Sequence, residues 1–117
     1  MTVLVIINEA PYSGERAYNA LRLAAALRQD KDVEVRLFFL GDGAWSASAK
    51  TQKPENASFD IPWLLERALA AGAHSLVCRT CMDARGILDS DLVNGAKRGT
   101  LDDLRAWTLS ADRVISF

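Results

Sequence analysis

The chain is poor in the residues that bind metals or build disulfide frameworks. Its 117 residues include two cysteines and one histidine. Two cysteines are too few for the dense crosslinking of small secreted domains. His74 precedes Cys78 by four residues, which is roughly 13 Å along an extended strand and too far for both to bind one ion. We therefore expect neither a disulfide scaffold nor a metal site.

Long apolar runs and an excess of positive charge are also missing. Fourteen Lys and Arg stand against fifteen Asp and Glu, whereas a nucleic-acid-binding surface needs a basic excess. The first apolar run, Val3–Ile7, is too short to span a bilayer, and no basic segment precedes it. No phosphate-binding glycine motif, GxSxG or HExxH is present. We expect a cytoplasmic protein without nucleic-acid or membrane partners and without a bound cofactor.

Apolar runs predict strands over residues 3–7, 33–40, 75–78 and 112–117. Amphipathic stretches predict helices over 15–29, between Asp60 and Gly72, and from Thr100 to about Leu109. Asp60 suits an N-cap, and Thr100 with Asp103 resembles a capping box. A short helix is expected over 44–50 and a loop over 51–59. Residues 82–99 are expected to be irregular, with one short helix near 90–95.

Strands that alternate with helices predict an α/β fold in which helices cover both faces of a mostly parallel sheet. The length of the chain fits a single domain over residues 1–117. Ligands of such sheets bind outside the carboxyl ends of the strands. Three loops should meet at that edge, over residues 8–14, 41–44 and 78–86.

The last of these loops carries both cysteines, Cys78 and Cys81, close to Arg79 and Arg85. A thiol is a good nucleophile only as the thiolate, and neighbouring cations favour that form. Persulfide transfer needs the same surroundings, because thiolate and persulfide are both anions. Cys78, Cys81 and Arg85 are therefore the candidate catalytic residues, although Cys78 could also be a small buried hydrophobe at a strand end.

A dithiol redox pair is the main alternative for any Cys-x-x-Cys motif. In thioredoxin-type sites the motif opens a helix, whose N-terminus stabilises the thiolate. Here residues 82–86, Met-Asp-Ala-Arg-Gly, are a poor helix start, and no aromatic residue precedes Cys78. A further alternative is a non-catalytic binding module that uses the same loop edge for a small ligand or a protein.

Other residues of the three loops are candidate pocket residues: Tyr12, Asp42, Gly43, Arg79 and Gly86. Tyr12 could donate a hydrogen bond to a sulfur anion, or it could cover the core. Asp42, between two glycines, could simply be a turn residue.

Several segments together resemble the DsrE/DsrF-like family, and within it the YchN-type branch. They are residues 10–15 (APYSGE), 21–28 (LRLAAALR), 52–54 (QKP), 78–87 (CRTCMDARGI), 99–101 (GTL) and 107–114 (WTLSADRV). The resemblance covers nearly the whole chain. It implies a three-layer α/β/α sandwich with a five-stranded sheet, so a fifth strand should lie between Leu88 and Gly99.

The resemblance also implies a function and an assembly. In sulfur-relay members, a cysteine seven residues before an Arg-Gly pair carries a persulfide and passes sulfur to a partner protein. Counting back from Arg85 and Gly86 gives Cys78, and Cys81 is the additional thiol of the YchN-type branch. A homo-oligomer, a hexamer or a trimer, is expected, with sulfur donor and acceptor proteins as partners. Trp45, Trp63 and Trp107 are candidates for either interface or core.

Overall fold

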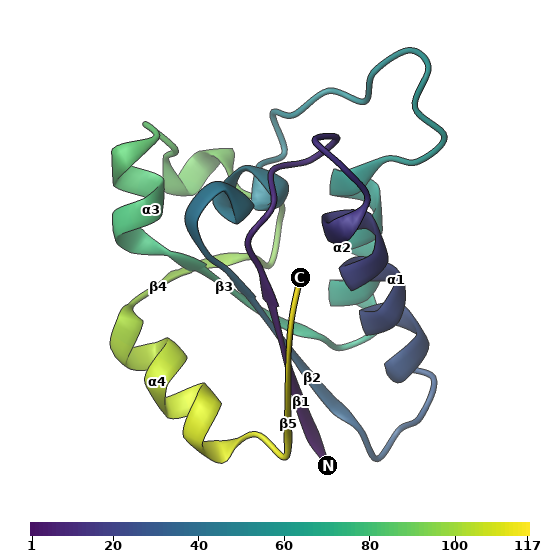
Figure 1. Cartoon of the computed structure of the whole chain (residues 1–117), viewed down its shortest axis with the longest axis vertical. Helices are drawn as coiled ribbons and strands as arrows, with labels where there is room; N and C mark the ends of the chain where they lie inside the picture. Colours follow the sequence, from purple (N-terminus) through teal and green to yellow (C-terminus); the bar gives the residue numbers. More distant parts are fainter.

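A single sheet of five parallel strands, in the order β4-β3-β2-β1-β5, runs through the computed structural model, which describes residues 1–117 (Figure 1). The strands are β1 (Thr2–Ile7), β2 (Glu34–Phe39), β3 (His74–Cys78), β4 (Lys97–Gly99) and β5 (Arg113–Ser116). The predicted α/β class is confirmed, and the sheet has five strands.

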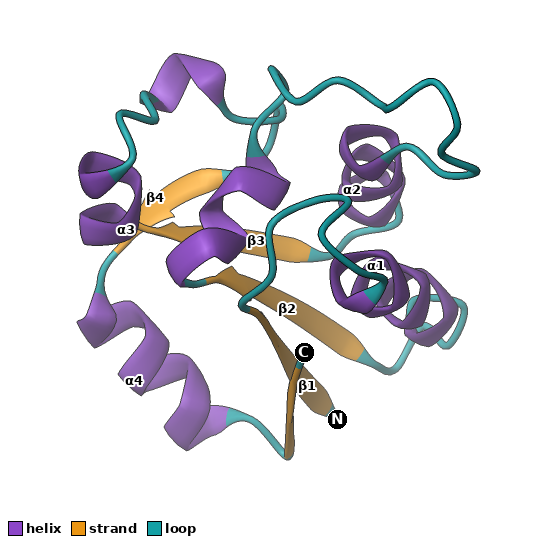
Figure 2. Ribbon diagram, turned by 45° about the horizontal axis from the view of Figure 1, so that its top comes forward, coloured by secondary structure: helices purple, strands orange, loops and turns teal.

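Helices cover both faces of the sheet (Figure 2). The helix α1 (Arg16–Leu27) and the helix α2 (Ile61–Ala70) lie together on one face. The helix α4 (Leu101–Ser110) lies on the other, between β4 and β5. The predicted three-layer α/β/α sandwich is therefore confirmed. No helix is both long and apolar enough to cross a membrane.

The two faces bury very different amounts of apolar surface. Twenty-one buried residues form the core on the α1–α2 side, whereas only Leu4, Phe38, Cys78 and Leu104 form the buried cluster on the α4 side. Side chains alternate between the faces of a strand, so Val77 belongs to the large core and Cys78 to the small one. This alternation turns the first cysteine toward α4.

Local side-chain chemistry fixes two helix starts as predicted. The carboxylate of Asp60 accepts a hydrogen bond from Trp63 N at 3.1 Å, which satisfies one of the free N–H groups of the first turn of α2. Thr100 and Asp103 form a reciprocal capping box at the start of α4. Each contact joins two residues that are three apart in the chain, so both contacts can be predicted from the sequence alone.

The structure differs from prediction between residues 41 and 99. A 3-10 helix, η1 (Gly41–Ala47), replaces the expected helix over 44–50. Residues 82–99 are more regular than expected: they include the end of α3 (Arg79–Ala84), the 3-10 turn η2 (Asp89–Asp91) and β4. The three-residue β4 is the fifth strand expected between Leu88 and Gly99, and the register of Cys78 with Gly99 places its end beside the cysteine loop.

Candidate functional site

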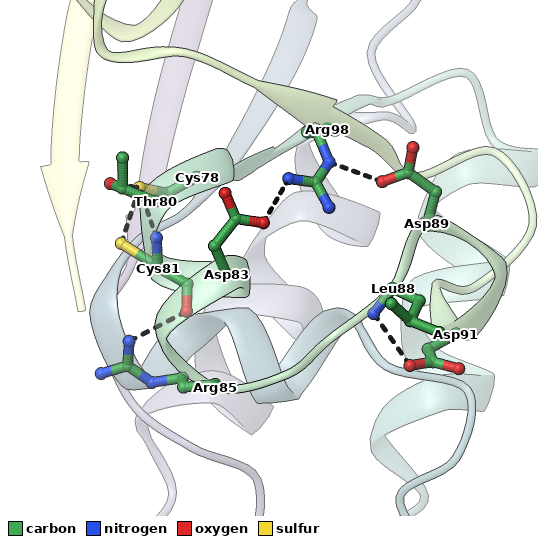
Figure 3. Close-up of polar contacts among 9 residues, drawn as sticks. All are labelled: Cys78, Thr80, Cys81, Asp83, Arg85, Leu88, Asp89, Asp91 and Arg98. Atoms are coloured by element: carbon green, nitrogen blue, oxygen red, sulfur yellow. Dashed lines mark hydrogen bonds and ion pairs between the residues drawn. The ribbon is translucent and has the colours of Figure 1, made fainter.

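Cys78 ends β3 and caps the helix that follows it. Its Sγ accepts a hydrogen bond from Cys81 N at 3.4 Å, and α3 begins at the next residue, Arg79 (Figure 3). The prediction that the Cys-x-x-Cys motif does not open a helix is therefore wrong. The cap itself supplies the missing start signal, because a sulfur in the N-cap position accepts the N–H that Ser or Asp usually satisfies.

The two thiols face each other. Both cysteines are free, and their Sγ atoms lie 2.6 Å apart with the Cys81 thiol donating to Cys78. The hydroxyl of Thr80 lies 3.4 Å from Cys78 Sγ. Cys78 is buried and Cys81 is partly buried. The geometry suits transfer of an atom or of electrons between the two sulfurs.

The surroundings shift the pKa values of the two thiols in opposite directions. Burial acts to raise the pKa of Cys78, but hydrogen bonds from the Cys81 thiol, the Thr80 hydroxyl and their backbone N–H groups outweigh it and bring the pKa below the ordinary value of 9.0. Burial and the adjacent Cys78 raise the pKa of Cys81, against the opposing effects of Gly41 N–H and Arg85. Cys78 is therefore the thiol that ionises first.

A second loop supports Cys81. Gly41 N donates to Cys81 Sγ at 3.1 Å, and Arg85 donates to Cys81 O at 3.0 Å. The same Arg85 pairs with Asp42 at 2.8 Å. Two of these contacts, Gly41 with Cys81 and Asp42 with Arg85, join the 41–44 and 78–86 loops as predicted, and they bring Cys81, Arg85 and Asp42 together as neighbours.

The remaining candidates are more dispersed. Tyr12 stacks on Phe59, and its hydroxyl accepts a hydrogen bond from Ile61 N at 3.1 Å, at the start of α2. Its contacts therefore lie with α2 and the loop before it. Gly43 is buried against the end of β1, where an added Cβ would lie 1.9 Å from Ile7 O. Gly86 closes the α3 turn at a φ of +66°.

One residue that sequence reasoning missed holds α3 from the strand side. Arg98, in β4, pairs with Asp83 at 2.7 Å and with Asp89 at 2.6 Å (Figure 3). These two carboxylates raise the pKa of the Arg98 guanidinium further above its usual value. Nothing in the local sequence indicates this contact, because it depends on the position of the short strand β4.

A cavity of about 440 Å³ opens beside Cys78. One wall is Cys78, Arg79 and Thr80, and the other is Thr100, Leu101 and Asp102 at the start of α4. Parallel strands β3 and β4 end side by side here, so both helices begin at the same edge. Of the predicted pocket residues, Arg79 lines this cavity, next to Cys78.

His74 lies at the exposed start of β3, at the opposite end of the strand from Cys78. No group of three or more His, Cys, Asp or Glu side chains is arranged to hold a metal ion.

Comparison with known proteins places this arrangement in a family. The sequence profile of the DsrE/DsrF-like family matches residues 1–117, and the chain belongs to that family. The YchN protein of Escherichia coli K12 is 41% identical over 116 residues, covering 98% of this chain and 97% of YchN. The crystal structure of E. coli YchN superposes with a TM-score of 0.91 over 100% of this chain and 99% of that one, at 39% identity.

More distant relatives are also informative. A protein described as a sulfurtransferase TusD homolog, from Pseudomonas aeruginosa, is 32% identical over 132 aligned residues, covering 100% of this chain and 97% of the relative. The structure of MTH1491 from Methanobacterium thermoautotrophicum has a TM-score of 0.72 at 16% identity, covering 99% and 98% of the two chains, and shares the fold. The chain is thus similar both to YchN and to a protein described as a sulfurtransferase homolog.

Proposed function

We propose that this protein is a sulfur carrier in which Cys78 accepts sulfane sulfur as a persulfide and passes it to a partner protein. The observation that carries the proposal is the thiol itself: Cys78 has a lowered pKa, a second thiol 2.6 Å away and an open cavity beside it. Family membership and the relative described as a sulfurtransferase homolog support the same chemistry.

The transfer of sulfur from the donor to Cys78 needs no external oxidant. The Cys78 thiolate attacks the outer sulfur of a donor persulfide, the donor's S–S bond breaks, and the donor leaves as a thiolate. Cys81 can then attack the outer sulfur and take it over, or attack the inner sulfur, in which case hydrosulfide leaves and a Cys78–Cys81 disulfide forms. The thiolate is the reacting form in each step. Arg85, which donates to Cys81 O at 3.0 Å, offsets part of the negative charge on the Cys81 side in this proposal.

The test is the intact mass of the non-reduced protein after exposure to a persulfide donor, with Cys78→Ser and Cys81→Ser alongside. We expect Cys81→Ser to gain one sulfur atom and Cys78→Ser to gain none, while the wild type gains one sulfur atom or, where Cys81 has attacked the inner sulfur, loses two hydrogens. Unmodified Cys78 in a protein that still reacts with a general thiol reagent would contradict the proposal. An unchanged mass in all three would favour a non-catalytic binding module.

A dithiol oxidoreductase is the second candidate, because the motif opens a helix and the Sγ atoms are 2.6 Å apart. In that reaction the two thiols pass two electrons and two protons to a disulfide substrate, which becomes two thiols. A loss of two hydrogens in the wild type, together with no gain of sulfur in Cys81→Ser, would identify this activity. Its reduction potential would then fall in the range of thioredoxin-like proteins.

We also propose that the protein works as a homo-oligomer, a hexamer or a trimer, in the cytoplasm and with sulfur donor and acceptor proteins. Reducing conditions there would keep both thiols available. Exposed apolar side chains at Trp63, Leu101 and Leu109 support self-association. Trp107 serves the fold, since it packs edge-on against Phe38. Sedimentation equilibrium measures the assembly directly.

A further inference from the structure

The cavity beside Cys78 carries one charge of each sign on its two walls. Arg79 belongs to the α3 wall and Asp102 to the α4 wall. Both side chains are exposed, and neither takes part in any of the six ion pairs of the chain. The charges that line this cavity are therefore available to a ligand.

The position of the thiol limits how a donor can reach it. Cys78 is only 6% exposed and faces the α4 side of the sheet, where it packs with Leu4, Phe38 and Leu104. The cavity is its opening to solvent, and its volume of about 440 Å³ falls in the range of about 300–1,000 Å³ that small-molecule sites occupy. This volume is large enough for a donor of amino-acid size.

We propose that this cavity binds a low-molecular-weight persulfide of zwitterionic, amino-acid type, with its carboxylate on Arg79, its ammonium on Asp102 and its outer sulfur at Cys78. This inference rests on the proposed function and names its small-molecule donor. Leu101 lines the α4 side of the same cavity. In the transfer, the Cys78 thiolate forms a bond to the outer sulfur while the donor's S–S bond breaks, and the amino acid leaves as its thiolate.

Three donors allow the two charge contacts to be tested one at a time. Cysteine persulfide has both charges, cysteamine persulfide lacks the carboxylate, and N-acetylcysteine persulfide lacks the ammonium. The readout is the rate at which Cys78 gains sulfur, followed by intact mass, and it is expressed as the ratio of rates between two donors on the same protein sample. A ratio is insensitive to the folded fraction and to a general change in the reactivity of Cys78. Comparing each variant's ratio with that of the wild type also cancels the intrinsic reactivities of the donors.

We expect Arg79→Gln to lower the rate ratio of cysteine to cysteamine persulfide by up to about fivefold, the upper limit for an exposed ion pair. Asp102→Asn should lower the ratio of cysteine to N-acetylcysteine persulfide by a similar factor. Arg105→Gln is the matched control: Arg105 is also exposed and lies on α4, but it does not line the cavity. Both ratios should keep their wild-type values in that variant.

Wild-type ratios in both Arg79→Gln and Asp102→Asn would overturn the inference and leave the proposed function standing. Failure of every donor to modify Cys78 would instead overturn the proposed function. In that case thiol–disulfide exchange with cystine, cystamine and N,N′-diacetylcystine decides the recognition separately, because these reagents offer the same charges to the same thiol. Exchange ratios that respond to Arg79→Gln and Asp102→Asn support the charge recognition, and unresponsive ratios reject it.

Discussion

Cys78 and Cys81 are three residues apart in the chain but differ in the hydrogen bonds that they receive. The Cys81 thiol is the foremost donor that lowers the pKa of Cys78, against the effect of burial. We predict that alkylation of Cys78 follows a pH profile with its midpoint below 9.0, and that Cys81→Ala moves this midpoint upward. Rates of iodoacetamide reaction between pH 5 and 10, read by mass, measure it.

Cys81→Ser is the matched control, because its hydroxyl keeps a donor near Cys78 while Cys81→Ala removes it. A midpoint that is the same in both variants would show that the side-chain donor is unimportant. The lowered pKa of Cys78 also affects stability. A thiol whose pKa is lower in the folded protein than in the unfolded chain stabilises the fold at pH values above the unfolded pKa. This contribution is lost as the pH falls through the folded pKa.

Gly43 is required for a steric reason: the structure leaves no room for a side chain at this position. A Cβ at this position would lie 1.9 Å from Ile7 O, so Gly43→Ala forces the backbone of η1 away from β1. We predict a loss of about 3 kcal/mol of unfolding free energy, at the upper end for overpacking. Gly86→Ala is the control, since Gly86 has a φ of +66° but open space around it, and it should cost about 1 kcal/mol. Urea denaturation distinguishes the two, and equal losses would contradict the steric argument.

The helix α3 has only six residues, so its own hydrogen bonds hold it weakly. Contacts from outside therefore determine its position: Asp83 pairs with Arg98 of β4, and Arg85 pairs with Asp42 of η1. We predict that Asp83→Asn reduces hydrogen-exchange protection of the α3 amides. Asp89→Asn removes the other partner of Arg98, which lies in η2, and should leave α3 protected. Equal protection in both variants would mean that the cap at Cys78 is sufficient.

The same helix shows where the sequence is informative and where it is not. The strands β1, β2 and β3 and the helices α1, α2 and α4 follow from apolar periodicity and from caps such as Asp60 and Thr100. The helix α3 and the strand β4 do not, because six and three residues are too few to establish a period. Their placement depends on Arg98, Asp83 and the Cys78 cap, which become neighbours only in the folded sheet.

The candidate site was predictable to the same extent. Cys78, Cys81 and Arg85 share one loop, so their proximity follows from the chain, and Asp42 joins them because β2 and β3 are adjacent parallel strands. Tyr12 follows β1, at the same edge, but a positive φ of 66° and its stacking on Phe59 place it against α2 instead. Thr100 was predicted only as a helix cap and Asp102 was not predicted as a site residue, because the exact position of β4, which brings both beside Cys78, does not follow from the sequence.

Across the whole molecule, the α4 face is the incompletely covered side. Four buried residues pack on this face, whereas twenty-one pack on the opposite face. The ends of α4 expose Leu101 and Leu109, at 72% and 74%, and a groove of about 320 Å³ is lined by residues between them. Exposed leucines beside a groove are typical of an interaction surface, which is consistent with the proposed homo-oligomer.

We therefore predict that Leu109→Asp reduces the mass of the assembly in sedimentation equilibrium, because a buried carboxylate without a partner is costly. Leu88→Asp is the matched control, since Leu88 is also exposed but lies between α3 and η2. Leu109 lies about two helical turns from Leu101 and outside the Cys78 cavity. The pH midpoint of Cys78 alkylation should consequently stay at its wild-type value. A wild-type mass for Leu109→Asp would place the interface elsewhere, and a monomeric wild type would reject the oligomer itself.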